Sequence, residues 1–269
     1  MTGEPYTLLE CTECRVLRTW PVPANLEPHY ASALGRLMQS TGSRLHAALK
    51  GWWIEQELRR ITNLSGDATM LDIGCGAGEV AAILQRQGRI VIAADAQDTP
   101  PPALAGRDHV SYHPFSFNTY ELKGFEPPGG PLVTIVRHVL EHLKDPVAFL
   151  RRMMIYGASA LYLVVPNAGC LERYLFGRSW YMWDPPRHLW HFQDQSLRRL
   201  LQTAGLQVVE TGYDTIPNVM PSLYRWGRLH GIPERRLTWA NPKSTLSTLC
   251  APLNLLLPHN VLWCIARLP

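Results

Sequence analysis

The chain has 269 residues and a formal net charge of +4, from 26 Lys and Arg against 22 Asp and Glu. Apolar residues make up 46% of it, which is enough for a sizeable core and excludes wholesale disorder. No block of Lys and Arg is present, so we do not expect nucleic acid as a partner. The chain opens without a secretory pattern, and its cysteines are mostly scattered, which predicts a cytoplasmic protein with reduced thiols.

The first thirty residues are expected to form loops, because Pro21, Pro23 and Pro28 interrupt any regular pattern. Residues 31–62 then place apolar side chains at spacings of three and four, which predicts helices. We therefore expect an N-terminal extension over residues 1–64.

From residue 65 onward, short apolar runs alternate with helical segments. The runs, which are expected to be strands, lie at 68–74, 89–96, about 109–113, 131–139, 160–166, 206–215 and 260–268. The helical segments lie at 79–87, 141–154 and 196–205. Continuous runs of Val, Ile and Leu indicate a parallel sheet with helices on both faces. The sequence predicts one doubly wound α/β domain over 65–269, with an insert at about 216–258.

The clearest motif is LDIGCGAGE at 71–79, where a predicted strand runs into three glycines and a helix follows. Glycines allow a tight turn and a close ligand, and the helix N-terminus offers amides to an anionic group. A dinucleotide fingerprint would need a glycine at Glu79, so a nicotinamide oxidoreductase is disfavoured. Asp95 ends the next strand, where an acid can accept hydrogens from a ribose diol. Asp72 reads as a buried carboxylate that needs a partner.

LDIGCGAGE followed by VIAADA resembles the first two motifs of class I S-adenosylmethionine-dependent methyltransferases. The series continues with RHVLEHLKDPVAFLRR at 137–152, YLVVPNAG at 162–169 and WDPPRHLWHFQDQSLRRLLQTAGLQVV at 183–209. It is similar to the methyltransferase domain 23 type, related to the ubiquinone-biosynthesis O-methyltransferases. The resemblance implies a seven-stranded, mostly parallel Rossmann-like sheet, with a helical N-terminal extension and S-adenosylmethionine as the cofactor.

The resemblance also implies the cofactor contacts. Asp72 would help to hold the amino group of the cofactor, and Asp95 would bind its ribose hydroxyls. His138 would lie near the transferable methyl group, and Tyr30 would reach the carboxylate. The other implied contacts are Gly74, Cys75, Gly76 and Gly78 along the methionine and ribose, Ala96 after the second strand, and Ser116 or Phe117 beside the adenine. The family often has an acid near residue 116, which this chain lacks.

The N-terminal extension is expected to cap the cofactor with its helices, including Trp52 and Trp53. Cys11 and Cys14 resemble the second half of a zinc ribbon with which related methyltransferases often begin. The ten residues before them hold no cysteine, and a structural zinc needs four ligands, so we expect no bound metal.

The segment RSWYMWDPPRHLWHF at 178–192 is rich in aromatic residues and contains a Pro-Pro that forbids a regular helix. It is expected either to pack against the sheet as a lid or to line a planar or sugar-like pocket. In the second case, the substrate-binding residues would be Trp180, Tyr181, Trp183 and His188. We refer to residues 178–192 as the aromatic segment.

A histidine with a pKa near 6.5 suits a general base that removes a proton from a hydroxyl acceptor. His188 and His191 are the leading candidates, with His138 and His142 behind them, and each could equally be a structural residue. The sequence thus predicts O-methylation of a small-molecule metabolite. N-methylation, C-methylation and an inactive cofactor-binding homologue are the alternatives.

The predicted insert has a basic part followed by an apolar tract. Its basic residues are Arg225, Arg228, Arg235, Arg236 and Lys243. Such a segment, here 225–258, can touch a membrane surface, cover the substrate cleft or meet a second copy in a homodimer. Core or cleft packing is favoured, because prolines interrupt the periodicity.

Overall fold

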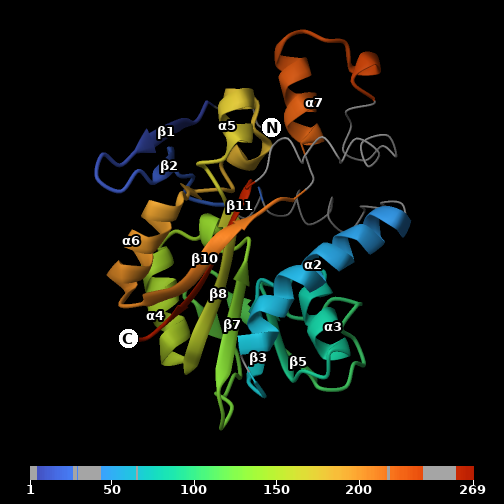
Figure 1. Ribbon diagram of the computed structural model, residues 1–269, viewed down its shortest axis with the longest axis vertical. Coiled ribbons are helices and arrows are strands. Elements are labelled where there is room, and N and C mark those ends of the chain that lie inside the picture. Colours follow the sequence, from blue (N-terminus) through green and yellow to red (C-terminus); the bar gives the residue numbers. More distant parts are fainter. Residues whose placement is uncertain (1–4, 27–28, 30–43, 65, 217–218, 239–258) are drawn as a thin grey trace. The chain divides into compact units, whose positions relative to one another are not determined.

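The computed structural model describes residues 5–26, 29, 44–64, 66–216, 219–238 and 259–269 (Figure 1). The chain divides into two compact units. The sheet unit comprises Ala47–Val164, Arg198–Thr211 and Cys264–Pro269, and the hairpin unit comprises Met1–His46, Val165–Leu197 and Gly212–Trp263. Tyr30, Lys243 and the whole apolar tract of the predicted insert lie outside the described residues.

An eight-stranded sheet has the order β10-β11-β8-β7-β3-β4-β5-β6. Its strands are β3 (Thr69–Ile73), β4 (Val91–Asp95), β5 (Val110–Ser116), β6 (Glu121–Leu122), β7 (Leu132–Arg137), β8 (Ala158–Pro166), β10 (Gln207–Asp214) and β11 (Val261–Arg267). The run from β8 through β7, β3 and β4 to β5 is parallel, and β6 is antiparallel to β5. The predicted α/β class is therefore confirmed, and the short strand β6 adds an eighth strand to the seven expected.

Helices cover both faces of this sheet within the sheet unit (Figure 1). They include α2 (Arg44–Leu64), α3 (Glu79–Arg86) and α4 (Pro146–Ile155), and α6 (Asp194–Ala204) begins in the hairpin unit and ends in the sheet unit. In α2, Ile54, Leu58 and Ile61 are buried at spacings of four and three, so one stripe of this helix faces the core. The expected helical periodicity is therefore present where the structure describes it.

The helix predicted at 141–154 is interrupted. A 3₁₀ helix, η1, covers Leu140–His142, and α4 begins only at Pro146. The carboxylate of Asp145 accepts a hydrogen bond from the backbone N–H of Ala148 at 2.9 Å and so caps α4. Proline suits the first helical position because its missing N–H would have no partner there, so these two residues fix the later start.

The N-terminal segment forms a hairpin, not the loops expected from its prolines. Strands β1 (Thr7–Glu10) and β2 (Leu17–Trp20) pair antiparallel, and β2 also pairs with β9 (Trp190–His191). Alternation explains the difference: Leu17 and Thr19 are buried, and the residues between and after them are exposed. The prolines follow β2 and end it.

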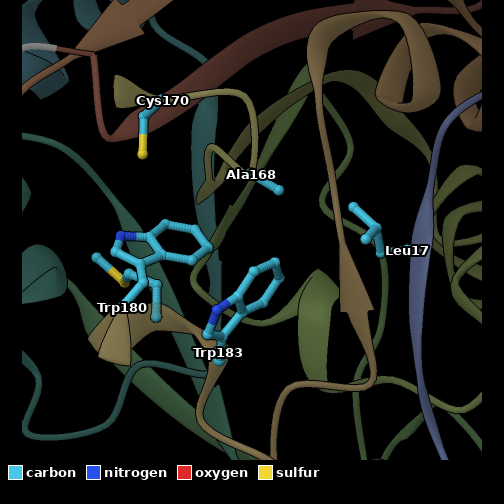
Figure 2. Close-up of a cluster of buried hydrophobic side chains, with 6 residues drawn as sticks. Leu17, Ala168, Cys170, Trp180 and Trp183 are labelled. Carbon is cyan, nitrogen blue, oxygen red and sulfur yellow. The ribbon is translucent and has the colours of Figure 1, made fainter. Parts of the chain in front are cut away.

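The core of the hairpin unit is an aromatic cluster (Figure 2). Trp180 is completely buried, and its ring centroid lies 4.9 Å from that of Trp183 in an edge-to-face arrangement. Leu17 from β2 joins the same cluster, together with Ala168, Cys170 and Met182. The remaining elements of this unit are α5 (Leu171–Phe176), η2 (Gly177–Ser179), η3 (Tyr181–Trp183), α7 (Met220–Leu229) and η4 (Glu234–Arg236). Among the described residues, no helix is both long and apolar enough to cross a membrane.

Candidate functional site

The glycine motif forms a tight turn between β3 and α3. Gly74, Gly76 and Gly78 all have positive φ angles, of 76°, 55° and 81°. A Cβ at Gly74 would lie 2.4 Å from Cγ2 of Val139, so only glycine fits there without displacement of its neighbour. A Cβ at Gly76 would meet no atom of the described residues within 4 Å, so among them the turn is open at this residue. A ligand can therefore approach the backbone at Gly76.

Asp95 ties the glycine turn to the end of β4. Its Oδ2 accepts a hydrogen bond from the N–H of Gly76 at 2.7 Å, and its Oδ1 accepts one from the N–H of Ala96 at 2.7 Å. Each carboxylate oxygen has a second lone pair, so Asp95 can still accept hydrogens from a diol. The carboxylate is half-buried at the carboxyl end of a parallel strand, where ligands of open α/β sheets bind.

Asp72 is a buried carboxylate in β3, with 2% of its surface exposed. Burial raises its pKa to about 7, although the positive charge of Arg137 opposes the rise and the negative charge of Asp95 adds to it. Its Oδ2 has no hydrogen-bond partner among the described residues. A buried polar atom without a partner is costly, so the arrangement fits a cationic ligand group that the protein itself does not supply.

Arg137 connects this carboxylate to α2. Its Nε lies 3.1 Å from both carboxylate oxygens of Glu57, and both side chains are largely buried. This ion pair attaches α2 to the end of β7, which is the strand next to β3. Neither residue could be identified from the sequence, because a charge pair 80 positions apart leaves no local pattern.

His138 follows β7 and has a φ of 54°, which is unusual for a residue other than glycine. Its backbone N–H donates to the carbonyl of Val164 at 2.8 Å, and its Nδ1 lies 3.4 Å from Oε1 of the buried Glu141. The fold thus holds His138 in a strained conformation at the same end of the sheet as Asp95. Glu141 was missed as a site residue, although its position three residues after His138 could have suggested the pair.

Ser116 and Phe117, which are expected beside the adenine, lie at the end of β5, and Ala96, another expected cofactor contact, follows β4. Ala96 and Ser116 line an open hollow of about 550 Å³. Ser116 Oγ accepts a hydrogen bond from the N–H of Thr119 at 3.2 Å, and the ring of Phe117 packs edge-to-face on Phe115. Cys75, also predicted to touch the cofactor, is buried, and burial raises the pKa of its thiol.

The aromatic segment lies in the hairpin unit, and the two tryptophans in it that were predicted to bind substrate are core residues. Trp180 is fully buried, and Trp183 donates its indole N–H to the carbonyl of Gly177 at 2.8 Å. Both side chains are therefore part of the core of the hairpin unit. That the aromatic segment acts as a lid on the sheet or lines a pocket stays a prediction. Of the other two predicted substrate residues, Tyr181 is partly buried and packs against the aromatic cluster, whereas His188 is not one of its members.

His191 is held as a neutral imidazole. Burial lowers its pKa to about 3, and the charge of Arg173 adds to this effect. Its Nε2 lies 2.9 Å from Oγ1 of Thr19, whose own hydrogen goes to the carbonyl of His188 at 2.7 Å. His191 therefore donates to Thr19, which is a structural arrangement. Thr19 was not singled out from the sequence, where a lone threonine in a short strand carries no signal.

His188 has a defined tautomer. Its Nδ1 lies 2.7 Å from the carbonyl oxygen of Met182, and because a carbonyl only accepts hydrogen bonds, Nδ1 must carry the hydrogen. In a neutral imidazole this leaves Nε2 as the unprotonated nitrogen, which is the form that a general base requires. His142, the reserve candidate, ends η1 and is half-buried in the sheet unit.

Cys11 and Cys14 lie in the turn of the β1–β2 hairpin, and both are partly exposed. The backbone N–H groups of Cys14 and Glu13 and the side chain of Cys14 lower the pKa of the Cys11 thiol. The expectation that this pair binds no metal stays a prediction.

The chain has a glycine turn, two nearby acids (Asp72 and Asp95) and a sheet with the strand order given above. These features are typical of the class of S-adenosylmethionine-dependent methyltransferases. The chain belongs to the methyltransferase domain family, whose model matches residues 49–211. S-adenosylmethionine is the cofactor of this class. Two features of the site fit this cofactor. The backbone at Gly76 leaves space for a ligand, and Oδ2 of Asp72 has no hydrogen-bond partner among the described residues. The relation to the ubiquinone-biosynthesis enzymes stays a prediction.

Solved structures share the fold. The 1,6-didemethyltoxoflavin-N1-methyltransferase of Burkholderia thailandensis is 16% identical, with a TM-score of 0.52 over 96% of each chain. The magnesium protoporphyrin IX methyltransferase of Synechocystis PCC 6803 is 13% identical, with a TM-score of 0.53 over 91% of this chain and 97% of its own. A SAM-dependent methyltransferase of Archaeoglobus fulgidus is 18% identical, with a TM-score of 0.52 over 81% and 94%. No curated protein matches the chain.

Proposed function

We propose that this methyltransferase transfers the methyl group to a hydroxyl of a small-molecule metabolite, with His188 as the general base. The observation that carries the proposal is the hydrogen bond from Nδ1 of His188 to the carbonyl of Met182, which leaves Nε2 to take a proton. His191 is a weaker candidate, because its pKa near 3 makes it a poor proton acceptor at neutral pH.

The cofactor would be held by residues of the glycine turn and its two acids. Asp72 would face the ammonium group of the cofactor, and the open backbone at Gly76 would lie along its methionine and ribose parts. Asp95 would accept the ribose hydroxyls while its amide contacts keep the turn in place. Ala96 and Ser116 would border the adenine. When bound, S-adenosylmethionine supplies a methyl group on a positively charged sulfur.

The residues of the chain would align the acceptor oxygen with the methyl group and would remove the proton of the acceptor hydroxyl. Methyl transfer is an in-line displacement, so much of the barrier is lowered by the close and aligned placement of the acceptor oxygen. Nε2 of His188 would take the hydroxyl proton as the new bond forms. His138, which follows β7 and has a positive φ angle, would border the methyl group.

Cofactor binding is tested by calorimetry with S-adenosylmethionine, S-adenosylhomocysteine and NADH. We expect both adenosyl compounds to bind and NADH not to bind. Asp95→Ala should weaken their binding about tenfold or more, because charged hydrogen bonds contribute about 1.5–3 kcal/mol. The control is Asp108→Ala, which removes an exposed acid from the loop after β4. A preference for NADH would refute the cofactor assignment.

The acceptor is tested with panels of phenols, alcohols and amines, in which formation of S-adenosylhomocysteine is measured. If the enzyme methylates oxygen, we expect turnover on the hydroxyl compounds. His188→Ala and His188→Gln should both abolish this turnover, and neither should change the affinity for the cofactor. N-methylation is the alternative, and one structural neighbour is named an N1-methyltransferase. Turnover confined to amines would support it, and cofactor binding without turnover on any panel would support an inactive homologue.

A further inference from the structure

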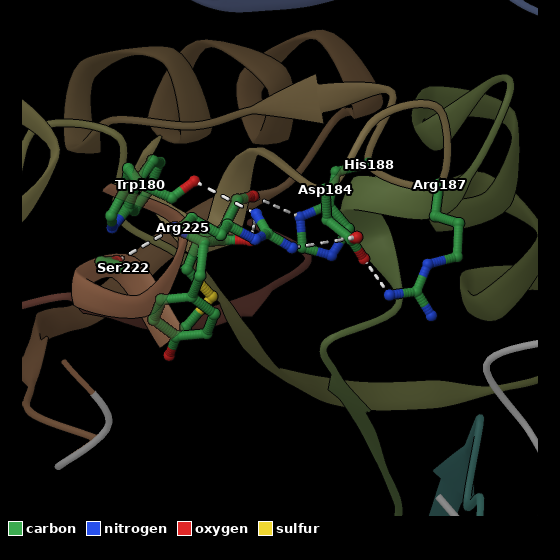
Figure 3. A network of polar contacts seen from close by, with 8 residues as sticks. Trp180, Asp184, Arg187, His188, Ser222 and Arg225 are labelled. Carbon is green, nitrogen blue, oxygen red and sulfur yellow. Dashed lines mark hydrogen bonds and ion pairs between the residues drawn. The ribbon is translucent and has the colours of Figure 1, made fainter. Parts of the chain in front are cut away.

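Helix α7 holds the backbone of Tyr181 at both of its polar atoms (Figure 3). Oγ of Ser222 accepts a hydrogen bond from the N–H of Tyr181 at 3.1 Å, and Nη1 of Arg225 donates to its carbonyl at 2.8 Å. Ser222 and Arg225 are three residues apart, so they lie on the same face of α7. One face of α7 therefore fixes the start of the 3₁₀ helix η3 within the aromatic segment.

The guanidinium of Arg225 is largely buried and needs partners there. Burial lowers its pKa, and the carboxylate of Asp184 opposes that change. Nη2 of Arg225 lies 3.8 Å from Oδ1 of Asp184, and Arg187 binds the other oxygen of the same carboxylate. One carboxylate thus serves two guanidinium groups and balances only one of their two positive charges. Helix α7 and the aromatic segment are joined by an ion pair as well as by hydrogen bonds.

Beneath this contact lies a buried acid. Glu172 of α5 is completely buried, and its Oε1 accepts a hydrogen bond from Oγ of Ser222 at 2.7 Å. Its Oε2 accepts one from Nδ2 of Asn260 at 3.3 Å. The hydroxyl of Ser222 gives its hydrogen to Glu172, so the lone pairs of the same oxygen are left to accept from the N–H of Tyr181. Ser222 is therefore the donor in one bond and the acceptor in the other.

The fixed segment presents two groups to His188. The carbonyl of Met182, one residue after Tyr181, accepts from Nδ1 of His188 at 2.7 Å. The carbonyl of Asp184 accepts from the backbone N–H of His188 at 3.2 Å. The position of the Met182 carbonyl therefore decides which ring nitrogen carries the hydrogen.

We propose that Arg225 is a positioning residue, which holds the 181–184 turn so that the Met182 carbonyl keeps His188 in the Nδ1–H tautomer. The use of that tautomer in catalysis rests on the proposed function. The tautomer itself is measured without turnover, so the two proposals can fail separately.

The test is nuclear magnetic resonance of the imidazole nitrogens in protein labelled with ¹⁵N-histidine, with the His188 signals assigned by their loss in His188→Gln. At neutral pH we expect the unsubstituted protein to show Nδ1–H at His188. Arg225→Met should shift the tautomer ratio toward Nε2–H by about fivefold, the effect of one lost hydrogen bond. Arg225→Lys should restore most of the original ratio, because an ammonium can still donate to the Tyr181 carbonyl.

The control is Arg228→Met on the same helix, whose side chain is exposed. It should leave the His188 signals unchanged. Binding of S-adenosylhomocysteine and the amide spectrum report whether each variant is folded. If Arg225→Met does not fold, Ser222→Ala takes its place, with the same expected shift. An unchanged tautomer ratio in a folded Arg225→Met or Ser222→Ala protein would overturn the proposal.

Discussion

Thr19 and His191 form a buried hydrogen bond, in which Oγ1 of Thr19 lies 2.9 Å from Nε2 of His191. The same hydroxyl donates to the backbone carbonyl of His188 at 2.7 Å. A single side chain in the N-terminal hairpin therefore satisfies two buried polar groups near the candidate base.

Thr19→Val should destabilise the protein by about 1–3 kcal/mol, because it leaves the imidazole N–H and the carbonyl without a partner while it preserves side-chain volume. Urea denaturation measures the change. Thr19→Ser should retain most of the stability, and Thr7→Val, on the exposed side of β1, should have no measurable effect. Equal losses of stability in Thr7→Val and Thr19→Val would show that the buried hydrogen bonds of Thr19 do not stabilise the protein.

His191 should make the protein sensitive to mild acid. Its pKa is near 3 in the folded state, below the ordinary value of 6.5, so the unfolded chain binds an extra proton between these values. Stability should therefore fall as the pH is lowered from about 6.5 toward 3, with a slope of up to about 1.4 kcal/mol per pH unit from this residue. Urea denaturation midpoints measured at several pH values in this range test this prediction. In His191→Gln, stability should depend less steeply on pH.

Asp72 should release a proton when the cofactor binds. Its pKa is raised to about 7 by burial, and an approaching ammonium group would lower it. Calorimetry of S-adenosylhomocysteine binding near pH 6.5, in buffers with different ionisation enthalpies, should detect a fraction of a proton released. Asp72→Asn should abolish the release and weaken binding. A binding heat independent of the buffer would show that Asp72 does not change its protonation.

The raised pKa of Asp72 also affects stability without ligand. A carboxyl with a pKa higher in the folded state loses its stabilising effect as the pH rises from about 4 to about 7. Asp72→Asn should therefore be more stable than the unsubstituted protein at pH 8, and this difference should vanish at pH 4.

Gly74→Ala should cost about 1–3 kcal/mol more than a control with the same backbone strain, because its Cβ would lie 2.4 Å from Val139. Gly88→Ala is that control: its φ of 79° is close to the 76° of Gly74, but its Cβ would meet no atom within 4 Å in the part of the chain that the structure describes. Thermal unfolding of both variants gives the comparison. Similar losses would show that the turn is strained but not closely packed.

Cys11 should react with iodoacetamide faster than the buried cysteines. Backbone N–H groups lower the pKa of its thiol, whereas burial raises the pKa of Cys170 to about 11. Mass spectrometry after short exposure at pH 7.5 should find the label first on Cys11. Early labelling of Cys170 in folded protein would contradict this order.

The sequence was sufficient to predict the sheet, because buried parallel strands are continuous apolar runs and LDIGCGAGE marks the turn after the first of them. It was not sufficient for the β1–β2 hairpin, whose four-residue strands are short and lie close to prolines. The contacts of Arg225 and Thr19 could not be predicted either. They join residues more than 40 positions apart, and no periodic pattern records such pairs.

The pairing of β2 with β9 has a consequence for the order of folding. Residues about 170 positions apart must meet before this three-stranded sheet is complete. Contacts of such long range form slowly, because the entropy of closing the intervening loop is lost before any bond is gained. During synthesis, the hairpin of β1 and β2 therefore lacks its third strand until Trp190 and His191 have left the ribosome.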